Sequence, residues 1–369
     1  MTLTSVMTLK GHKGFIRSMA YFPDGKRIIS VSYDKTIRQW DLQAGKEIEE
    51  VQDVYEGEIY EVVVSRDCRW IMTLVGDGEH CELKAYEVET GIVKTLQDSQ
   101  GITCIDISTD GKLLAGESFD RTVLIWGMDT GERVAGPFKS RDKVAAVRFS
   151  PDSKKLAVES NCRRRLEVWD VQTQELDAQV GKKGCDYCIN APIFWTKKGT
   201  ILAEFKFTFE DYGNREATAI YEFNASTLET VGDPFEGERS IRDLALSFDG
   251  TLLASSSIDT IKLWDFEPRQ LLASFHVQHH SMWISDLTFS SDARQLAYSV
   301  YNAICICNTP PDILAGIRVA PDAQAVVRIC CKYLIVDVLI SSSRSVHLTI
   351  QPSTSYSMCS PHCSIHLHY

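Results

Sequence analysis

The sequence lacks three features that would each point to a particular class of protein. No apolar run approaches the ~20 residues that a membrane-spanning helix needs. No G-x-x-x-x-G-K-[ST] loop occurs, and no G-x-G-x-x-G lies at a strand–helix junction, so the common phosphate-binding motifs are missing. Basic residues are in deficit, with 39 Lys and Arg against 50 Asp and Glu and a net charge of −11. Because phosphate contacts need a basic face, we expect no direct nucleic-acid binding, and we also expect no membrane association and no cofactor.

The first residues also lack the marks of an exported protein. Residues 1–12, MTLTSVMTLKGH, contain neither the basic segment nor the apolar segment of a secretory signal. We therefore expect a cytoplasmic or nuclear protein, in which the 12 cysteines are reduced thiols and not a disulfide framework.

What the sequence does contain is clearest between Gly11 and Asp41. This stretch, GHKGFIRSMAYFPDGKRIISVSYDKTIRQWD, has alternating apolar runs separated by the turns FPDGK at 22–26 and YDK at 33–35. Alternation with a period of two, broken by Pro, Gly and Asp, predicts short antiparallel strands.

The Gly-His start and the Trp-Asp end of this stretch resemble a WD repeat, the unit of a β-propeller blade. The resemblance implies a structural polar set of four side chains, His12, Ser30, Asp34 and Trp40. In the family's pattern Asp34 accepts a hydrogen bond from the His12 ring, His12 meets Ser30, and Ser30 meets the indole N–H of Trp40. Only this first copy keeps all four residue types.

Six looser copies follow the first one. The position of Trp40 recurs at intervals of 46, 40, 43, 52, 43 and 43 residues, as Tyr86, Trp126, Trp169, Tyr221, Trp264 and Cys307. A second register runs through the turn after the first strand of each copy, as Asp24, Asp67, Asp110, Asp152, Lys198, Asp249 and Asp292. Two registers that agree on a period near 43 indicate seven repeats.

We therefore predict an all-β fold, a seven-bladed β-propeller of four-stranded antiparallel blades formed by residues 1–317. The seventh copy has only three strands before Pro310 and Pro311 stop the pairing. Residues 4–9 form a spare strand ahead of the first copy. We expect this N-terminal strand to complete the last blade and close the ring, because closure removes exposed strand edges.

Two segments depart from the repeat. The fifth copy carries extra residues around 209–215 between its second and third strands, where insertions often serve binding but also occur without a role. Residues 318–369 are expected to be a C-terminal tail outside the propeller and poorly ordered, or a segment foreign to the native protein, and no fold is assigned to them.

Three groups of residues have the types used in catalysis or metal binding. His12, Ser30 and Asp34 are the types of a hydrolase triad, but a triad also needs an exposed nucleophile and an oxyanion hole. Cys185 and Cys188 have the spacing of a zinc or redox pair without a second pair at zinc-ribbon or zinc-finger spacing. The Cys and His residues of 359–368 are dense but have no core behind them. We predict no catalytic residue and no metal site.

One face of the predicted ring carries the residue types of a binding surface. Antiparallel strands alternate ends, so the loop before each first strand and the turn between the second and third strands lie at the same end of a blade. Aromatic residues and arginines at these rim positions are Phe15, Arg17, Tyr33, Tyr60, Phe119, Arg242, Trp283 and Tyr301. Because exposed aromatics and Arg dominate interface energies, we predict that they bind a protein or peptide partner. The alternative is that some of these rings lean inward and cap the blades.

The predicted function is a non-enzymatic interaction scaffold or adaptor that acts as a monomer within a larger complex. Two alternatives stay open. WD-repeat arrays like this one also occur as sensors, here with a signalling NTPase on another chain. A propeller hydrolase would need acids, bases or metal ligands on the inner strands, where Met19-Ala20, Val62-Val63, Ala145-Ala146 and Leu244-Ala245 look small and apolar.

Overall fold

The structure is a computed structural model of residues 1–369. It describes residues 5–48, 57–77, 81–96, 101–118, 120–160, 163–181, 192–205, 207, 219–235, 241–277, 284–316, 325–331, 334–340 and 346–350. The chain divides into two compact units, Met1–Ile317 and Arg318–Tyr369.

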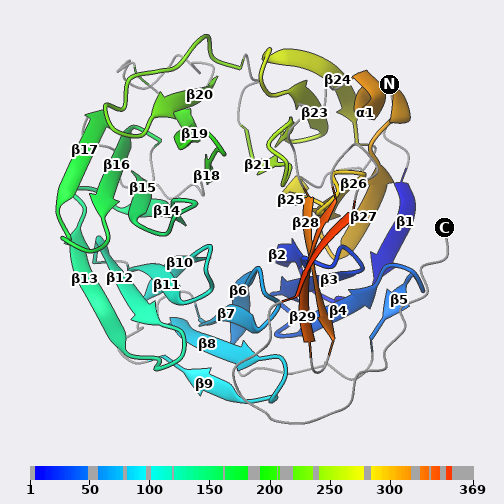
Figure 1. Ribbon diagram of the computed structural model, residues 1–369, viewed down its shortest axis with the longest axis horizontal. Coiled ribbons are helices and arrows are strands. Elements are labelled where there is room, and N and C mark those ends of the chain that lie inside the picture. The colour runs from blue at the N-terminus through cyan, green and yellow to red at the C-terminus, as the bar shows by residue number, and fades with distance from the viewer. Residues whose placement is uncertain are drawn as a thin grey trace. The chain divides into compact units, whose positions relative to one another are not determined.

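The first unit is a ring of seven antiparallel sheets, which are the blades of the propeller (Figure 1). From the innermost strand outwards, blade 1 consists of β2 (Ile16–Tyr21), β3 (Arg27–Ser32), β4 (Ile37–Asp41) and β5 (Lys46–Glu47). Blade 2 consists of β6 (Glu58–Val64), β7 (Trp70–Gly76), β8 (Cys81–Glu87) and β9 (Val93–Thr95). Blade 3 consists of β10 (Ile102–Ile107), β11 (Leu113–Ser118), β12 (Thr122–Gly127) and β13 (Arg133–Lys139).

The remaining blades follow the same plan. Blade 4 consists of β14 (Val144–Phe149), β15 (Lys155–Ser160), β16 (Arg165–Asp170) and β17 (Leu176–Gly181). Blade 5 contains β18 (Ile193–Trp195), β19 (Thr200–Phe205) and β20 (Ala219–Asn224). Blade 6 consists of β21 (Asp243–Leu246), β22 (Leu252–Ser256), β23 (Thr260–Asp265) and β24 (Gln270–His276). Blade 7 consists of β25 (Ile284–Phe289), β26 (Gln295–Val300), β27 (Ala303–Asn308) and β1 (Ser5–Lys10).

The fifth blade departs from regular pairing on its outer side. Isolated bridges join Ile220 to Phe235 and Phe223 to Thr230, so residues 230–235 take the place of the fourth strand. With this segment counted, the predicted fold of seven four-stranded blades is confirmed. The insertion predicted at 209–215 lies outside the described residues.

The ring is closed by strand β1, as the sequence predicts. It pairs antiparallel with β27, from Ser5 opposite Cys307 to Lys10 opposite Ala303. Leu9 of β1 is only 2% exposed, and it packs with Ile304 and Ile306 of β27. The first and last strands of the propeller therefore share one sheet, and the prediction of closure is confirmed.

A recurring turn explains why the first two strands of each blade form locally. In blade 3 the Ser108 hydroxyl donates to Asp110 Oδ1 at 2.7 Å, and the same oxygen accepts the N–H of Lys112 at 3.2 Å. Blades 2, 4, 6 and 7 repeat this Ser–x–Asp turn, with hydroxyl-to-carboxylate distances of 2.5, 2.7, 2.6 and 2.7 Å. Asp side chains that bond the backbone two residues on favour tight turns, so the periodic Asp residues set the hairpins.

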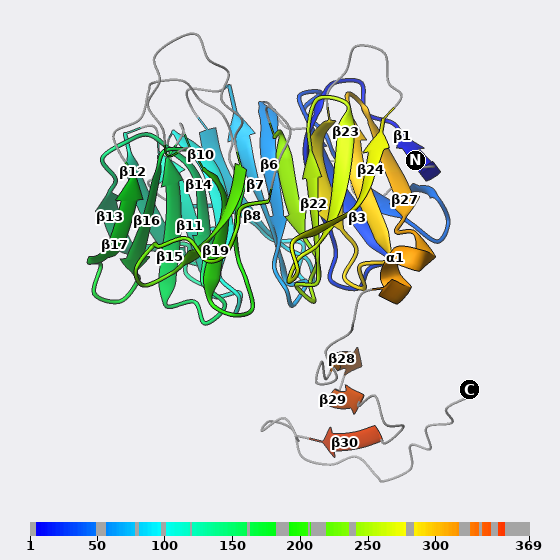
Figure 2. The same cartoon turned by 90° about the horizontal axis from the view of Figure 1, so that it is seen from above.

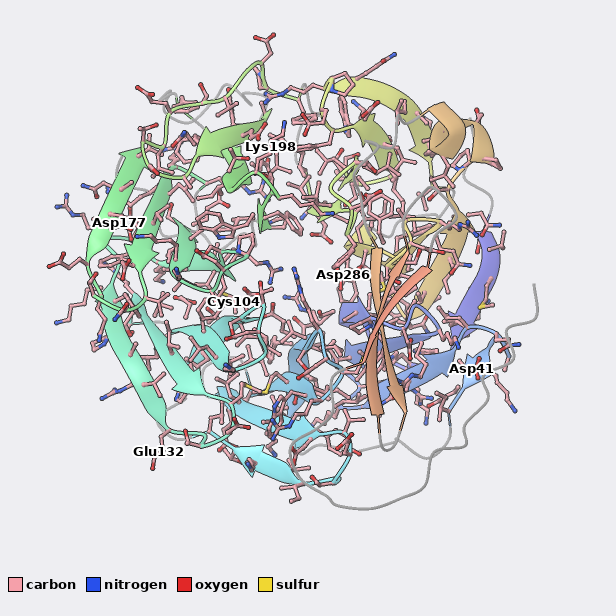
Figure 3. The ribbon with its side chains drawn as sticks, viewed as in Figure 1. Asp41, Cys104, Glu132, Asp177, Lys198 and Asp286 are labelled. Carbon is pink, nitrogen blue, oxygen red and sulfur yellow. The ribbon has the colours of Figure 1, made fainter. Side chains whose placement is uncertain are left out.

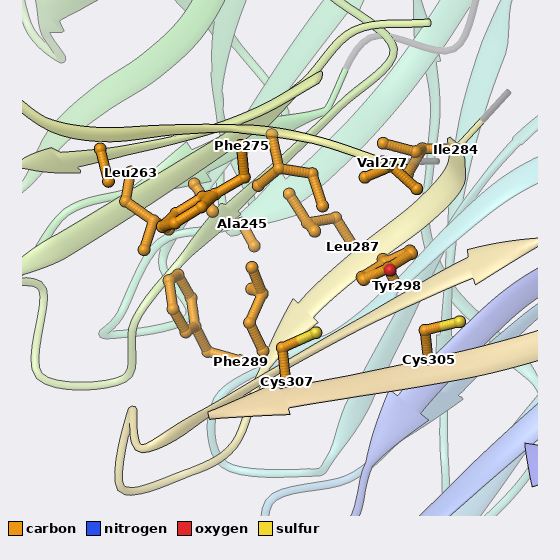
Figure 4. Close-up of a cluster of buried hydrophobic side chains, with 14 of the residues drawn as sticks. Ala245, Leu263, Phe275, Val277, Ile284, Leu287, Phe289, Tyr298, Cys305 and Cys307 are labelled. Atoms are coloured by element: carbon orange, nitrogen blue, oxygen red, sulfur yellow. The ribbon is translucent and has the colours of Figure 1, made fainter. Parts of the chain in front are cut away.

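The hydrophobic core lies between neighbouring blades. Figure 4 shows one such cluster, in which Phe275 of blade 6 packs near Leu287 and Tyr298 of blade 7. Inner strands of consecutive blades also touch, since β2 contacts both β6 and β25. Figure 2 shows that the strands run from one face of the ring to the other, so every blade presents its loops and turns on the two faces.

The first unit ends with helix α1 (Pro311–Gly316). Among the described residues no helix is long and apolar enough to cross a membrane. The second unit contains an antiparallel sheet of β28 (Ala325–Cys331), β29 (Leu334–Ile340) and β30 (Val346–Ile350).

Candidate functional site

The predicted polar set stands where the chain enters the first blade. With the His12 proton on Nδ1, this nitrogen donates to Asp34 Oδ2 at 3.1 Å. The Ser30 hydroxyl then donates to His12 Nε2 at 2.9 Å and accepts the indole N–H of Trp40, also at 2.9 Å. The structure thus brings all four side chains into one closed network, which satisfies the buried polar groups.

The ionisation of this network suits a structural role. Burial lowers the pKa of His12, although Asp34 opposes the shift, so the ring is neutral at neutral pH. Burial opposes the ionisation of Asp34, but hydrogen bonds from Thr36 and from the Lys13 backbone lower its pKa to about 2. Ser30 is 0% exposed and therefore cannot reach a substrate as a nucleophile.

Next to this network, four rings from three blades form a continuous aromatic row: Tyr301, Phe15, Tyr33 and Tyr60. The centroid of Phe15 lies 6.5 Å from that of Tyr301 and 6.2 Å from that of Tyr33. Tyr33 lies 5.5 Å from Tyr60 in an edge-to-face contact. Such distances are within the range of favourable aromatic pairs. The row begins in blade 7, crosses blade 1 and ends in blade 2, so it exists only because the ring is closed.

The aromatic row is partly open to solvent. Tyr301 is 40% exposed, and Phe15, Tyr33 and Tyr60 are half-buried. Arg17 belongs with the row, because its guanidinium lies over the Tyr33 ring at 5.5 Å from the centroid. The buried Nε of Arg17 has no hydrogen-bond partner in the described part of the chain. The Tyr60 hydroxyl donates to Glu58 at 3.0 Å.

Three further residues were predicted for the same rim. Arg242 is exposed just before β21, and its backbone N–H donates to Ser256 O at 2.7 Å. None of the ring contacts that form the aromatic row includes Arg242. Phe119 and Trp283 lie outside the described residues, as do Cys185, Cys188 and the Cys and His residues of 359–368.

The inner strands carry acids that sequence reasoning missed. Each of four carboxylates accepts a backbone N–H from the inner strand of the next blade, and one of these pairs is Asp106 Oδ2 with Phe149 N at 2.8 Å. The other three pairs are Asp286 Oδ2 with Met19 N at 2.5 Å, Asp243 Oδ2 with Leu287 N at 2.6 Å, and Glu61 Oε2 with Ile105 N at 2.9 Å. These bonds join consecutive blades around the centre of the ring, where Figure 3 labels Asp286 on β25 and Cys104 on β10.

A periodic signal for these acids was present in the sequence. Asp243 and Asp286 are 43 residues apart, as are Trp264 and Cys307. The prediction that the inner positions are small and apolar was based on residues beside these acids in the sequence and not on the acids themselves. Val62 and Leu244, for example, are buried in the core and directly follow Glu61 and Asp243. An acid directly before such a buried residue was the signal to look for.

The local electrostatics of the inner strands are dominated by burial. Burial raises the pKa of Glu61 to about 7, with Arg148 opposing the shift. Burial also raises the pKa of Asp286 to about 6, and that of Asp243, which is hydrogen-bonded to it, well above its usual range. Arg148 Nη1 donates to Asp106 Oδ1 at 2.7 Å.

Acids in a central channel are what the hydrolase alternative requires, but these are already engaged. All four carboxylate oxygens of Asp243 and Asp286 accept backbone N–H groups, at 2.5 to 2.8 Å. Two of these bonds, to Met19 N and Leu287 N, join consecutive blades, so the two acids have a structural role in the ring. Among the described residues no cluster of three or more His, Cys, Asp or Glu could hold a metal ion.

Comparison with known proteins agrees with the geometry. The sequence model of the family described as "WD domain, G-beta repeat" matches residues 3–41, 91–127 and 230–265. Each match runs from the outer strand or segment of one blade through three strands of the next, for example from β1 to β4. The chain contains WD repeats and folds as a β-propeller. Propellers of this family generally serve as protein-interaction scaffolds and are typically not enzymes.

Several curated proteins resemble parts of the chain. Apoptotic protease-activating factor 1 of Rattus norvegicus is 22% identical, over 79% of this chain and 26% of its own length. Periodic tryptophan protein 2 of Saccharomyces cerevisiae is 22% identical, over 49% of this chain and 24% of its own length. Nuclear distribution protein PAC1 of Arthroderma otae is 50% identical, but over only 14% of this chain and 12% of its own length. The chain therefore spans about a quarter or less of the length of these relatives.

Proposed function

We propose that this protein is a non-enzymatic interaction module that binds a protein or peptide partner on the rim that carries the aromatic row. We further propose that residues 1–317 form the domain responsible, and that it works in the cytoplasm or nucleus as a monomer within a larger complex. Phe119, Trp283 and Arg242 belong to the proposed surface by their place in the repeat.

The observation that carries the proposal is the continuity of the aromatic row. Tyr301, Phe15, Tyr33 and Tyr60 touch in sequence across three blades, and Arg17 lies over the row. Aromatic side chains and Arg supply most of the energy in many interfaces because they desolvate well and have few torsions to fix.

The row is also held in place before any partner arrives. Asp34, next to Tyr33 in the chain, is fixed by bonds to His12, Lys13 N and Thr36. Rings that are ordered in the free protein lose little entropy on binding, so each contact contributes more to affinity. This supports a binding role over a purely capping role for the half-exposed rings.

The test is a comparative pull-down from lysate of the source cells. The full chain is compared with a Tyr33→Ala/Tyr60→Ala variant, which removes two neighbouring rings of the row. Val134, which is 52% exposed on the outer strand β13, supplies a control variant, Val134→Ser, away from the rim. All three proteins must first give matching thermal melts, so that lost binding is not lost folding.

We expect a defined set of partners to be captured by the full chain and by Val134→Ser and to be lost from the double variant. If the double variant retains those partners at the same level, the rim is not their site. A partner lost equally from both variants would also contradict a rim-specific site.

Two other functions were considered from the sequence. A sensor role beside a signalling NTPase on another chain would use the same rim and differs only in the partner, so the pull-down distinguishes it by identifying that partner. For a hydrolase, the inner-strand acids would have to act while bonded to the backbone of the next blade, and no observation favours it.

A further inference from the structure

The face opposite the rim has its own set of equivalent positions. In each blade, the residue before the turn Asp, or before Lys198 in blade 5, lies between the first and second strands. We call these seven positions the turn ring. Its members are Pro23, Arg66, Thr109, Pro151, Lys197, Phe248 and Ser291. The turn ring contains two cations, one aromatic residue and no acid.

The cations and the aromatic residue of the turn ring meet, although they come from distant blades. The guanidinium of Arg66, from blade 2, lies over the Phe248 ring of blade 6 at 5.6 Å from its centroid. The ammonium of Lys197, from blade 5, lies over the same ring at 5.7 Å. Since blades 2 and 6 are not neighbours, Arg66 must reach across the middle of this face.

The resulting cluster is exposed. Phe248 is 62% exposed, the largest value among the exposed large hydrophobic residues that the structure describes, and both cations are exposed too. Single exposed apolar residues are common on protein surfaces, so the exposure of Phe248 becomes informative only together with the two cations that lie over its ring.

Neither cation has a carboxylate partner among the described residues. Arg66 feels the charge of Asp106, but Asp106 is already paired with Arg148 at 2.7 Å. Lys197 feels the charge of Asp249 without forming an ion pair with it, and Asp249 already accepts the Ser247 hydroxyl at 2.6 Å within its own turn. Asp67 likewise accepts the Ser65 hydroxyl at 2.5 Å. The neighbouring Lys198, by contrast, forms an ion pair with Glu267 at 2.5 Å.

We propose that Arg66, Lys197 and Phe248 form a second docking site, on the face opposite the rim, for an acidic peptide segment that carries an apolar side chain. The two cations pair with its carboxylates, and the apolar side chain packs against the edge of Phe248. This site is independent of the partner proposed for the aromatic row.

Charge complementarity selects this occupant. Two cations without carboxylate partners favour a ligand with at least two negative charges. A nucleotide would bring phosphates, but its base would have to displace a cation from the ring to stack on it. The chain's own residues 318–369 are unsuited, because they contain four basic residues and two acidic ones.

The experiment measures fluorescence anisotropy of labelled peptide pools with the full chain. One pool contains random heptapeptides with three Asp or Glu and one Leu or Phe. A second pool has Asn and Gln in place of the acids, and mant-ATP is a third probe. The variants are Arg66→Ala, Lys197→Ala and Phe248→Ala, with Lys198→Ala as the matched control, each checked by thermal melt.

We expect the acidic pool to bind more tightly than the amide pool and to weaken as salt is raised. Each of the three site variants should weaken binding by about three- to ten-fold, in line with exposed ion pairs and cation–π contacts. Lys198→Ala should stay within about two-fold of the parent, because Lys198 already has a carboxylate partner.

Three results would overturn the proposal. One is equal affinity for the acidic and amide pools. Another is a loss of affinity for the acidic pool in Lys198→Ala as large as the loss in Lys197→Ala. The last is binding of mant-ATP that depends on these residues while the acidic pool does not bind, which would assign the site to a nucleotide.

Discussion

The backbone N–H of Met19 donates to Oδ2 of Asp286 at 2.5 Å, across the junction between the first and last blades. Ile16 N also donates to Tyr301 O at 2.6 Å at the same junction. The ring is thus joined twice, on the inner side by these bonds and on the outer side by the pairing of β1 with β27. Closure depends on both joints, and the aromatic row crosses the same junction.

The pairing of β1 with β27 predicts that substitutions at two residues of β1 lower the free energy of unfolding by very different amounts. Leu9 is 2% exposed and Val6 is 54% exposed. Leu9→Ala should lower the free energy of unfolding by about 2 to 4 kcal/mol, because it removes packed methyl groups and leaves a cavity. Val6→Ala should cost less than about 0.5 kcal/mol. Urea denaturation of both variants checks this, and equal losses would mean that β1 does not seal the ring.

The polar set predicts that a serine-to-alanine substitution destabilises the protein more in blade 1 than in blade 6. Ser30→Ala removes bonds to both His12 and Trp40, and leaves two buried polar groups without partners. We expect a loss of about 2 to 4 kcal/mol in the free energy of unfolding. Within the described part of the chain, the Ser255 hydroxyl of blade 6 accepts one bond, from the Trp264 indole N–H at 3.2 Å, so Ser255→Ala should cost about 1 kcal/mol. A larger loss for Ser255→Ala in denaturant titrations would contradict a cooperative network in blade 1.

Glu61 predicts a dependence of stability on pH. Its pKa rises from 4.5 to about 7 in the folded protein, so the folded state holds a proton that the unfolded state releases between these values. Stability should therefore fall as the pH rises from about 4.5 to 7. The full shift corresponds to about 3 kcal/mol, but Glu61 is only half-buried, so solvent screens part of it and we expect about 1 to 2 kcal/mol.

The variant Glu61→Gln isolates this contribution. Gln keeps an oxygen that can accept the N–H of Ile105, but it has no proton to lose. His12 acts in the opposite direction, because its lowered pKa costs stability as the pH falls below its unfolded value, and it is common to both proteins. The difference in free energy of unfolding between variant and parent should grow between pH 5 and 8. A difference that is constant over this range would show that Glu61 keeps its ordinary pKa.

The backbone at Gly181 predicts that a substitution there strongly destabilises the protein. It has a φ of +94°, and a Cβ at this position would lie 1.8 Å from the carbonyl oxygen of Arg164. Gly181→Ala should therefore cost more than about 3 kcal/mol or prevent folding. Gly199 also has a positive φ, +75°, but a Cβ there would meet nothing within 4 Å, so Gly199→Ala should cost only about 1 kcal/mol. Thermal melts of the two variants separate the two effects. Gly181→Ala has both a steric clash and an unfavourable φ, whereas Gly199→Ala has only the unfavourable φ.

The sequence by itself determined the parts of this protein that are encoded locally. Strand alternation between Gly11 and Asp41, the periodic turn Asp residues and the recurrence of Trp40 were enough to predict seven blades. The spare strand before the first copy was enough to predict closure. The blades rest on hairpins of neighbouring residues, whose hydrogen bonds and turns depend on side chains a few positions apart. Closure pairs distant residues, and it was predictable because the last copy lacks one strand and the chain begins with a spare one.

Only the tertiary structure decided which distant side chains meet. Arg66 and Phe248 lie 182 positions apart in the sequence, and nothing in their separate turns indicates that one reaches the other. The contact of Phe15 with Tyr301 and the bond of Met19 to Asp286 likewise cross the ring junction. Such contacts depend on how seven sheets pack against each other around an axis, which sets distances and directions that no local pattern contains.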